Sequence, residues 1–186
     1  MELKYRFINK RLTYTGRELS SHWLYRNFNL HGDAMAAFVG PAQVKESLVD
    51  MVDRKRNREI RSSLMLHFIS EYFDMDLEKT ILRERLFISL LSQEINRASK
   101  KYIVERRGND LYVGEKKLSV AIATLTPVSC VFHVGLNIIS SGAPVKAIGL
   151  RELSLSARTL ADKAAKLYRN ELEDVLIGRS KVRGVL

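Results

Sequence analysis

Two long segments of the chain repeat apolar residues at the spacing of an α-helix. From Leu77 to Asn96, leucines and isoleucines form a broad apolar face, and Asp76 precedes them as a helix cap. From Leu155 to Ile177, apolar residues recur at the same spacing with polar residues between them. We expect Ser154 to begin this second helix and Gly178 to end it.

Shorter apolar segments separated by turn residues predict strands. The opening segments KYRFI and RLTY predict a hairpin that turns at Asn9-Lys10, and a short helix is expected from Ser20 to Phe28. Residues Asp33 to Val44 predict a strand that leads into a loop at Pro41. The segment Ser63 to Phe73 is assigned to a strand, although its periodicity also fits a helix.

Four further strands are expected to follow one another in antiparallel order: Tyr102 to Glu105, Leu111 to Val113, Lys117 to Leu125 and Val128 to Ile139. The pattern has no regular alternation of strands and helices. It therefore predicts an α+β fold, with a mainly antiparallel mixed sheet flanked by helices. We find no linker and no internal repeat, and we expect a single domain over residues 1–186.

Composition narrows the class of protein. The 186 residues are 46% hydrophobic and 28% charged, which is typical of a globular chain and not of a disordered one. Because Cys130 is the only cysteine, the fold contains no internal disulfide, and we expect a cytoplasmic protein. The segment from Leu118 to Val145 lacks charged residues, but its polar interruptions and its β-branched residues favour buried strands over a membrane span.

Basic residues outnumber acidic ones by 31 to 21, which gives a net charge of +10. Such an excess suits an anionic partner without identifying it. The basic segment Arg54 to Arg61 contains no aromatic residue, and the chain has no recognised nucleic-acid-binding motif. We therefore do not expect nucleic acid as the partner, and we interpret this segment as a solvated loop or exposed helix.

Several common catalytic and binding motifs are absent from the sequence. There is no GxxxxGK[ST] or GxGxxG loop for a nucleotide phosphate and no GxSxG elbow for a nucleophilic serine. The four histidines are scattered and no CxxC pair exists, so we expect no metal site in the protein itself. Cys130 and His133 are three residues apart, on opposite faces of a strand, and do not suit a catalytic dyad.

Lys117 is the strongest candidate for a functional residue. It stands where a glycine-containing turn leads into a long apolar strand, and a charge at such a place is costly unless an anion compensates it. An ammonium group held there suits a carboxylate or a phosphate, and it would stabilise negative charge that develops during adenylation. The alternative is that Lys117 closes a hairpin beside Glu115 and reaches water.

The segments around Lys117 resemble the central sheet of the biotin protein ligases and lipoate ligases. Asn109-Asp110-Leu111, Lys117-Leu118-Ser119 and Gly135-Leu136-Asn137-Ile138 follow the order of the ligase motifs N-D, K-[LI]-[SA]-G and G-[IL]-N-[VI]. The blocks GDAMAAFVGPAQV, MVDRKRN, MLHFISEYFD and GNDLYVGEKKLSVAIA are similar to an uncharacterised prokaryotic family with this class II aminoacyl-tRNA synthetase-like fold. The resemblance implies a seven-stranded domain in which Lys117 contacts an activated acyl group.

The chain also departs from these families. The Gly- and Arg-rich loop that closes over the adenylate is absent upstream of Lys117, and Arg106-Arg107-Gly108 lies instead at the N-D turn. Val120 stands where the ligases have glycine. The segment His133 to Ile138 is similar to a strand of the octanoyltransferases, yet residues 145–149 lack the cysteine nucleophile of those enzymes. The resemblance therefore supports the scaffold more strongly than the catalysis.

Eight further polar residues are candidates to bind a ligand: Arg107, Asn109, Asp110, Ser119, His67, Glu71, His133 and Asn137. Arg107 would assist with a phosphate, while Asn109 and Asp110 position the turn. His67 with Glu71, and His133 with Asn137, each share one face of an element, and a buried hydrogen-bond network is the alternative for both pairs. Three aspartates are candidates to hold magnesium with a nucleotide phosphate, or else are capping or exposed residues: Asp33, Asp50 and Asp53.

Three functional hypotheses remain open. The first is a ligase or acyltransferase that binds a small carboxylic acid of the biotin, lipoate or octanoate class, uses ATP with magnesium, and passes the acyl group to a protein lysine or another nucleophile. The second is a non-catalytic binding or assembly protein on the same scaffold, and the third is electrostatic binding of nucleic acid. Because sheet edges need covering, we also expect a homodimer or a higher homo-oligomer.

Overall fold

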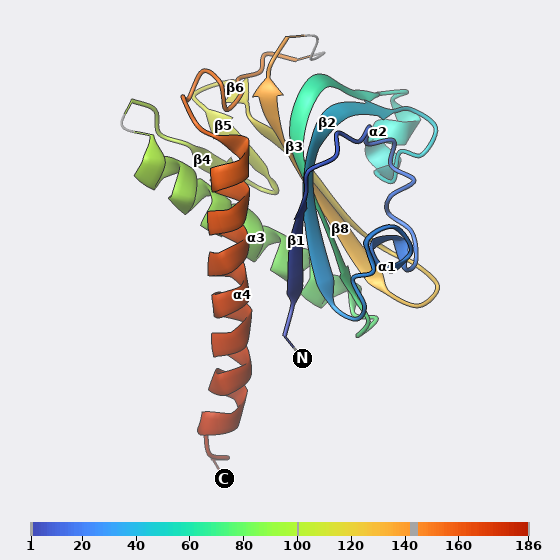
Figure 1. Cartoon of the computed structure of the whole chain (residues 1–186), viewed down its shortest axis with the longest axis vertical. Helices are drawn as coiled ribbons and strands as arrows, with labels where there is room; N and C mark the ends of the chain where they lie inside the picture. The colour runs from blue at the N-terminus through green and yellow to red at the C-terminus, as the bar shows by residue number, and fades with distance from the viewer. Residues whose placement is uncertain (1, 100, 142–144, 186) are drawn as a thin grey trace.

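The computed structural model describes residues 2–99, 101–141 and 145–185 of the chain (Figure 1). It has the expected α+β architecture. The elements in chain order are β1 (Lys4–Ile8), α1 (Trp23–Phe28), β2 (Ala34–Val44), α2 (Met51–Lys55), β3 (Ile60–Tyr72), α3 (Leu77–Ala98), β4 (Glu105–Arg107), β5 (Asp110–Val113), β6 (Lys116–Lys117), β7 (Ser119–Leu125), β8 (Cys130–Ile139) and α4 (Ala157–Lys181).

The strands form two sheets. The main sheet has the order β1-β2-β3-β8-β7, and the small sheet has the order β4-β5-β6. Only β1 and β2 pair in parallel among the described strands, so the mainly antiparallel mixed sheet is confirmed. The seven-stranded domain implied by the resemblance is not found, because the strands divide into sets of five and three. The chain changes sheets at Leu118: Lys117 pairs with Tyr112 in the small sheet and Ser119 with Leu136 in the main sheet.

The hairpin predicted at Asn9-Lys10 is wrong. β1 lies parallel to β2, with Lys4 opposite Ala34, and the segment after β1 continues beside β2 in the same direction, with Tyr14 opposite Ala42. The loop predicted at Pro41 is also wrong, because β2 continues through it with a register shift between Gly40 and Ala42. The carbonyl of Pro41 accepts a hydrogen bond from the Tyr14 N–H at 2.9 Å. A bulge of this kind accommodates proline, which has no N–H to donate to a ladder.

Helices α3 and α4, both predicted from their apolar faces, lie on the same face of the main sheet (Figure 1). Asp76 caps α3 by accepting a hydrogen bond from the Lys79 N–H at 2.9 Å. The cap predicted for α4 is wrong, because Ser156, not Ser154, accepts from the Thr159 N–H. The helix also continues through Gly178 to Lys181, since one glycine in a helix costs only about 1 kcal/mol.

Two apolar clusters occupy opposite faces of the main sheet. The cluster under α3 and α4 contains stacked aromatic rings, among them Phe87 and Phe132. The cluster on the other face packs β2 and β3 against α1 and the preceding loop, with Tyr14 and Leu24 almost fully buried. Cys130 is buried, in agreement with a core position. No helix in the described parts of the chain has the length and apolarity of a membrane span.

Candidate functional site

Lys117 lies at the junction of the two sheets, where its backbone is held on both sides. Its N–H donates to the Lys146 carbonyl at 2.9 Å, and its own carbonyl accepts from the Ile148 N–H at 3.1 Å. The same carbonyl accepts a longer bond from Asn137 Nδ2 at 3.4 Å. These bonds fix the main chain of Lys117, so the direction of its side chain is set by the fold.

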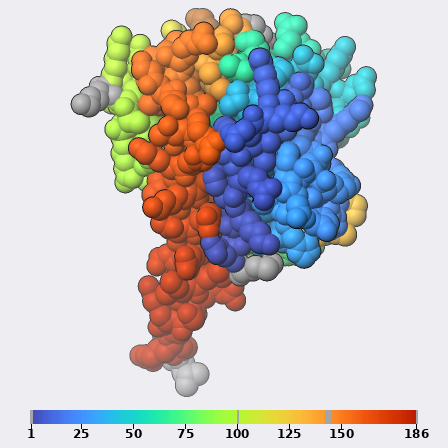
Figure 2. Space-filling model, viewed as in Figure 1, coloured from blue at the N-terminus to red at the C-terminus, as the bar shows by residue number. Residues whose placement is uncertain are grey.

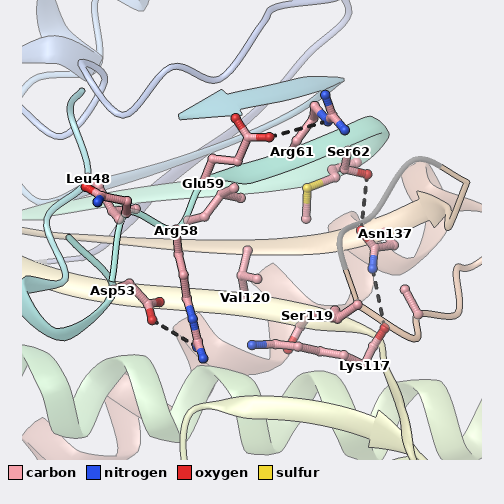
Figure 3. Close-up of a pocket in the computed structure, with 15 residues that line it drawn as sticks. Leu48, Asp53, Arg58, Glu59, Arg61, Ser62, Lys117, Ser119, Val120 and Asn137 are labelled. Atoms are coloured by element: carbon pink, nitrogen blue, oxygen red, sulfur yellow. Dashed lines mark hydrogen bonds and ion pairs between the residues drawn. The ribbon is translucent and has the colours of Figure 1, made fainter. Parts of the chain in front are cut away.

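A cavity of about 550 Å³ opens beside Lys117 (Figure 3). This volume lies within the range of about 300–1,000 Å³ that is usual for small-molecule sites. Its walls come from the segment around α2, the start of β3, the adjoining parts of β6, β7 and β8, and the chain near residue 146. The lining residues are Leu48, Asp53, Asn57, Arg58, Glu59, Ile60, Arg61, Ser62, Met65, Lys117, Ser119, Val120, Asn137, Val145 and Ala147.

Two cationic side chains converge at one end of this cavity. In Figure 3 the ends of the Lys117 and Arg58 side chains point into the same part of the cavity. Each has an acidic neighbour: Lys117 Nζ lies 2.6 Å from Asp110 Oδ2, and Arg58 lies 3.2 Å from Asp53 Oδ1. Burial raises the pKa of the Asp110 carboxyl, and the charge of Lys117 opposes that effect. Paired donors of this kind suit a ligand with a carboxylate or phosphate group.

A smaller cavity of about 120 Å³ adjoins the first one and shares Lys117, Asp53 and Val120 with it. Its wall also contains Asp50, Asn109 and Asp110, and it reaches His133 and Tyr14. Val120, which stands where the ligases have glycine, is part of the wall of both cavities.

His67 and His133 form a buried histidine pair, and His133 is the member that lines the smaller cavity. His67 Nε2 lies 3.1 Å from the Gly40 carbonyl, which only accepts, so this nitrogen carries the proton. His67 Nδ1 is then an acceptor for His133 Nε2–H at 3.0 Å, and this leaves His133 Nδ1 unprotonated in the neutral pair. Burial lowers the pKa of His67 to about 4 and lowers that of His133 as well. Both rings are therefore neutral near pH 7, and Tyr14 stacks on His133 with 3.8 Å between the ring centroids.

Six of the nine predicted site residues line one or both cavities: Lys117, Ser119, Asn137, Asn109, Asp110 and His133. Two of them also hold the turn before β5 against β7. Ser119 Oγ accepts from the Leu111 N–H at 2.8 Å, and Asn109 Nδ2 donates to the Ala121 carbonyl at 2.8 Å. The structure thus brings the N-D turn and Lys117 together, as the motif order predicts.

The other three predicted residues line neither of these cavities. Arg107 is exposed and forms ion pairs with Glu105 and Glu115. Glu71 lies toward the far end of β3, where its Oε1 accepts from Ser129 Oγ and from the His22 N–H, both at 2.7 Å. His67 is buried behind His133. For Glu71 and His67, the buried hydrogen-bond network is the arrangement found.

The three aspartates proposed for magnesium do not come together. Asp33 accepts from the Phe73 N–H and lines a separate groove between α3 and α4. Asp50 caps α2 by accepting from the Val52 and Asp53 N–H groups, and Asp53 pairs with Arg58. Within the described residues, no group of three or more His, Cys, Asp or Glu side chains is arranged to hold a metal ion.

Sequence reasoning missed most of the wall that faces Lys117. Arg58, Arg61 and Ile60 belong to the basic segment interpreted as a solvated surface, yet all three line the larger cavity. A signal was present, because MVDRKRN was among the blocks similar to the uncharacterised family. Tyr14 was assigned only to a hairpin strand, although it stacks on His133.

Comparisons with known proteins agree with the architecture. Residues 3–183 match the family model described as Domain of unknown function (DUF366). A solved protein of unknown function from Pyrococcus horikoshi is 36% identical, with a TM-score of 0.92 over 99% of this chain and 100% of its own.

Two more distant solved structures share the fold. The biotin protein ligase from Aquifex aeolicus, in complex with biotin and ATP, is 14% identical with a TM-score of 0.61, over 91% of this chain and 70% of its own. A candidate lipoate protein ligase from T. acidophilum with bound lipoic acid is 12% identical with a TM-score of 0.57, over 91% of this chain and 86% of its own. At these identities the likeness concerns the fold alone.

Proposed function

Because this chain belongs to the DUF366 family of unknown function and has the fold of biotin and lipoate ligases, we propose that it binds a small carboxylic acid beside Lys117. The observation that carries the proposal is the position of the Lys117 ammonium in the wall of a cavity of about 550 Å³ that Arg58 also lines. The solved ligases of this fold hold biotin or lipoic acid, which are acids with an aliphatic chain.

The lining of the cavity supports an acid with an apolar body. Leu48, Ile60, Met65, Val120 and Val145 supply apolar contacts, while Lys117 and Arg58 stand together at one end. In this arrangement the carboxylate points to the two cations and the aliphatic part lies along the apolar wall. Charge-assisted hydrogen bonds to a carboxylate are about twice as strong as neutral ones, so the cations determine the orientation of the ligand.

With ATP as second substrate, the reaction is formation of an acyl-adenylate. A carboxylate oxygen attacks the α-phosphorus, the bond to the bridging oxygen of the β-phosphate breaks, and pyrophosphate leaves. Lys117 and Arg58 would stabilise the negative charge on the transferring phosphoryl group. The acyl group then passes to a nucleophile, for which a lysine amine of an acceptor protein is the candidate: the amide bond forms, the acyl–phosphate bond breaks, AMP leaves and the amine loses a proton.

No step of the proposed reaction uses magnesium held by side chains of this protein. Asp50 is used as a helix cap and Asp53 as the partner of Arg58, so neither is a free ligand for a metal ion in this arrangement. A nucleotide could bring its own magnesium, but no step here depends on it.

The test is pyrophosphate release and thermal shift with ATP and biotin, lipoate or octanoate. We expect one acid to raise the melting temperature and to support turnover. Lys117→Ala should lower turnover by about 100-fold or more, as removal of one donor to a developing charge does elsewhere. Lys116→Ala is the matched control, because Lys116 is the exposed neighbour and lies outside both cavities. Absence of both pyrophosphate release and thermal shift for every pair would contradict the proposal.

A second candidate is a binding protein without catalysis. It is favoured by the 2.6 Å contact with Asp110, which already compensates the charge of Lys117 without a ligand, and by Val120 in the cavity wall. This candidate predicts a thermal shift with an acid but no pyrophosphate release. The same two measurements therefore separate it from the ligase.

A further inference from the structure

The C-terminal part of α4 extends beyond the rest of the protein (Figures 1 and 2). The buried residues of α4 end at Tyr168, while the helix continues to Lys181. With a rise of about 1.5 Å per residue, roughly 20 Å of helix follows the last buried side chain. This part of α4 receives little packing from its own chain.

The apolar face of α4 does not end where its burial ends. Leu172, Val175 and Leu176 continue the spacing of the buried residues, and Val175 and Leu176 are 52% and 43% exposed. They line a groove of about 430 Å³ together with Leu82 and Leu86 of α3. Leu82 is itself 61% exposed. Charged residues of both signs, among them Arg83 and Glu173, line the same groove. An exposed apolar surface rimmed by polar residues is a typical interaction site.

The charges of the extending segment are divided along its length. After Arg169, which pairs with Glu2, the acidic residues Glu171, Glu173 and Asp174 come first. The basic residues Arg179 and Lys181 follow about one to two turns after Asp174, and Arg183 lies just beyond the end of the helix. Two copies of this segment placed antiparallel bring the acidic part of each beside the basic part of the other. A parallel arrangement would place like charges together. The segment is therefore complementary to itself about a two-fold axis near Leu176.

We propose that this groove and the extending end of α4 form a homodimer interface, occupied by the same surface of a second copy of this chain. Leu172, Val175 and Leu176 of one copy pack against Leu82, Leu86 and the same helix of the other. The charge pattern fixes the antiparallel direction. The inference does not depend on the proposed function, because none of these residues lines the cavities beside Lys117.

The first test is the mass of the full chain in solution, measured by light scattering or sedimentation from low to high micromolar concentration. We expect the wild type to have twice the mass of one chain and Leu176→Glu to have the mass of one chain. Val128→Glu is the matched control, because Val128 is 43% exposed, as Leu176 is, but lies at the turn before β8. It should remain dimeric. Far-UV circular dichroism shows whether each variant is folded.

A wild type that is monomeric at every concentration would overturn the proposal. So would a dimer that persists in Leu176→Glu or dissociates in Val128→Glu, because another face would then hold the copies together. Arg179→Glu should also weaken the dimer, by placing acidic residues of both copies side by side.

The second test uses cross-linking and does not depend on the stability of a charged variant. The only natural cysteine, Cys130, is fully buried, so an introduced cysteine reacts alone. Near a two-fold axis a residue meets its own copy, so Leu176→Cys should form a disulfide-linked dimer under mild oxidation. Val128→Cys should not. Failure of Leu176→Cys to cross-link, or equal cross-linking of both variants, would count against the two-fold interface.

Discussion

The two faces of the main sheet use alternate residues of the same strands, yet they bury different chemistry. On β8, Phe132 enters the aromatic cluster under α3 and α4, and the next residue, His133, lies on the other face and stacks on Tyr14. On β3, Phe68 and His67 divide in the same way. Side chains alternate along a strand, so one register serves both faces. The face covered by α3 and α4, called here the helix-covered face, provides most of the stability of the fold. The other face carries the candidate site.

The side covered by α3 and α4 also buries polar groups, among them Glu84 of α3. Its carboxyl is buried on the helix-covered side, and Oε1 has no hydrogen-bond partner among the described residues. Burial raises the pKa of Glu84 to about 7; the charge of Arg85 opposes this effect, and the charge of Asp110 adds a smaller contribution to it. Each face therefore contains a buried titratable group, and the two groups respond to pH in opposite directions.

The largest expected effect is on the helix-covered face. Phe132→Ala removes a ring that packs against Phe87, Tyr72 and Tyr168, and we expect it to lower the free energy of unfolding by about 3–5 kcal/mol. Urea denaturation measures the change. Val128→Ala, at a 43% exposed residue nearby, should change it by less than about 0.5 kcal/mol. Equal effects of the two substitutions would contradict the assignment of this face as the main source of stability.

The histidine pair should make the other face sensitive to acid. The unfolded chain protonates His67 near its ordinary pKa of 6.5, whereas the folded protein keeps it neutral down to about 4. The stability due to His67 is therefore complete above pH 6.5 and is lost as the pH falls toward 4, by about 3 kcal/mol in all. Denaturation of wild type and His67→Gln at a series of pH values tests this. An equally steep acid dependence in His67→Gln would refute it.

Glu84 should act in the opposite sense. Its folded pKa of about 7 is above the ordinary value of 4.5, so its favourable contribution is complete below pH 4.5 and is lost as the pH rises through 7. Glu84→Gln should therefore raise the free energy of unfolding by about 3 kcal/mol at pH 8 and have little effect at pH 4.5. A substitution that acts equally at both pH values would show that the ionisation of Glu84 is not the cause.

The smallest effect concerns the end of a helix. Asp76→Ala removes the acceptor of the Lys79 N–H and should lower the free energy of unfolding by about 1 kcal/mol, whereas Asp76→Asn retains a good cap. Glu46→Ala, at an exposed position in the turn after β2, is the control for loss of a carboxylate that caps no helix. Thermal denaturation of the three variants decides between a capping role and a general charge effect.

The two faces also differ in how far the sequence predicts them. The apolar faces of α3 and α4 are local patterns, and both helices were predicted, although α4 begins and ends later than expected. Lys117 was expected to begin a long apolar strand, and it lies at the end of β6, just before β7. The parallel pairing of β1 with β2 was not predicted, because a strand's own sequence does not specify its neighbour. For the same reason the sequence did not predict that Arg58 and Lys117 line the same cavity, since only the fold brings these distant segments together.

The first residue of α4 was harder to predict from the sequence than the existence of the helix. Ser154 and Ser156 are equivalent as capping residues in sequence, and only the backbone distinguishes them. Ser154 has a φ of 57°, in the left-handed region, while Ser156 is extended and accepts from Thr159. Periodicity thus predicts that a helix exists more reliably than it predicts its first residue.

The construction of α2 has a practical consequence. This short helix contributes Asp53 to both cavities, yet none of its own residues is buried. Such a segment unfolds locally with a small free-energy cost. Trypsin cleaves the peptide bonds that follow lysine and arginine, and this segment contains Arg54, Lys55, Arg56 and Arg58. A ligand in the cavity should therefore slow digestion at this segment, even when its chemical identity is unknown. The rate of digestion can then be used to screen metabolites for binding.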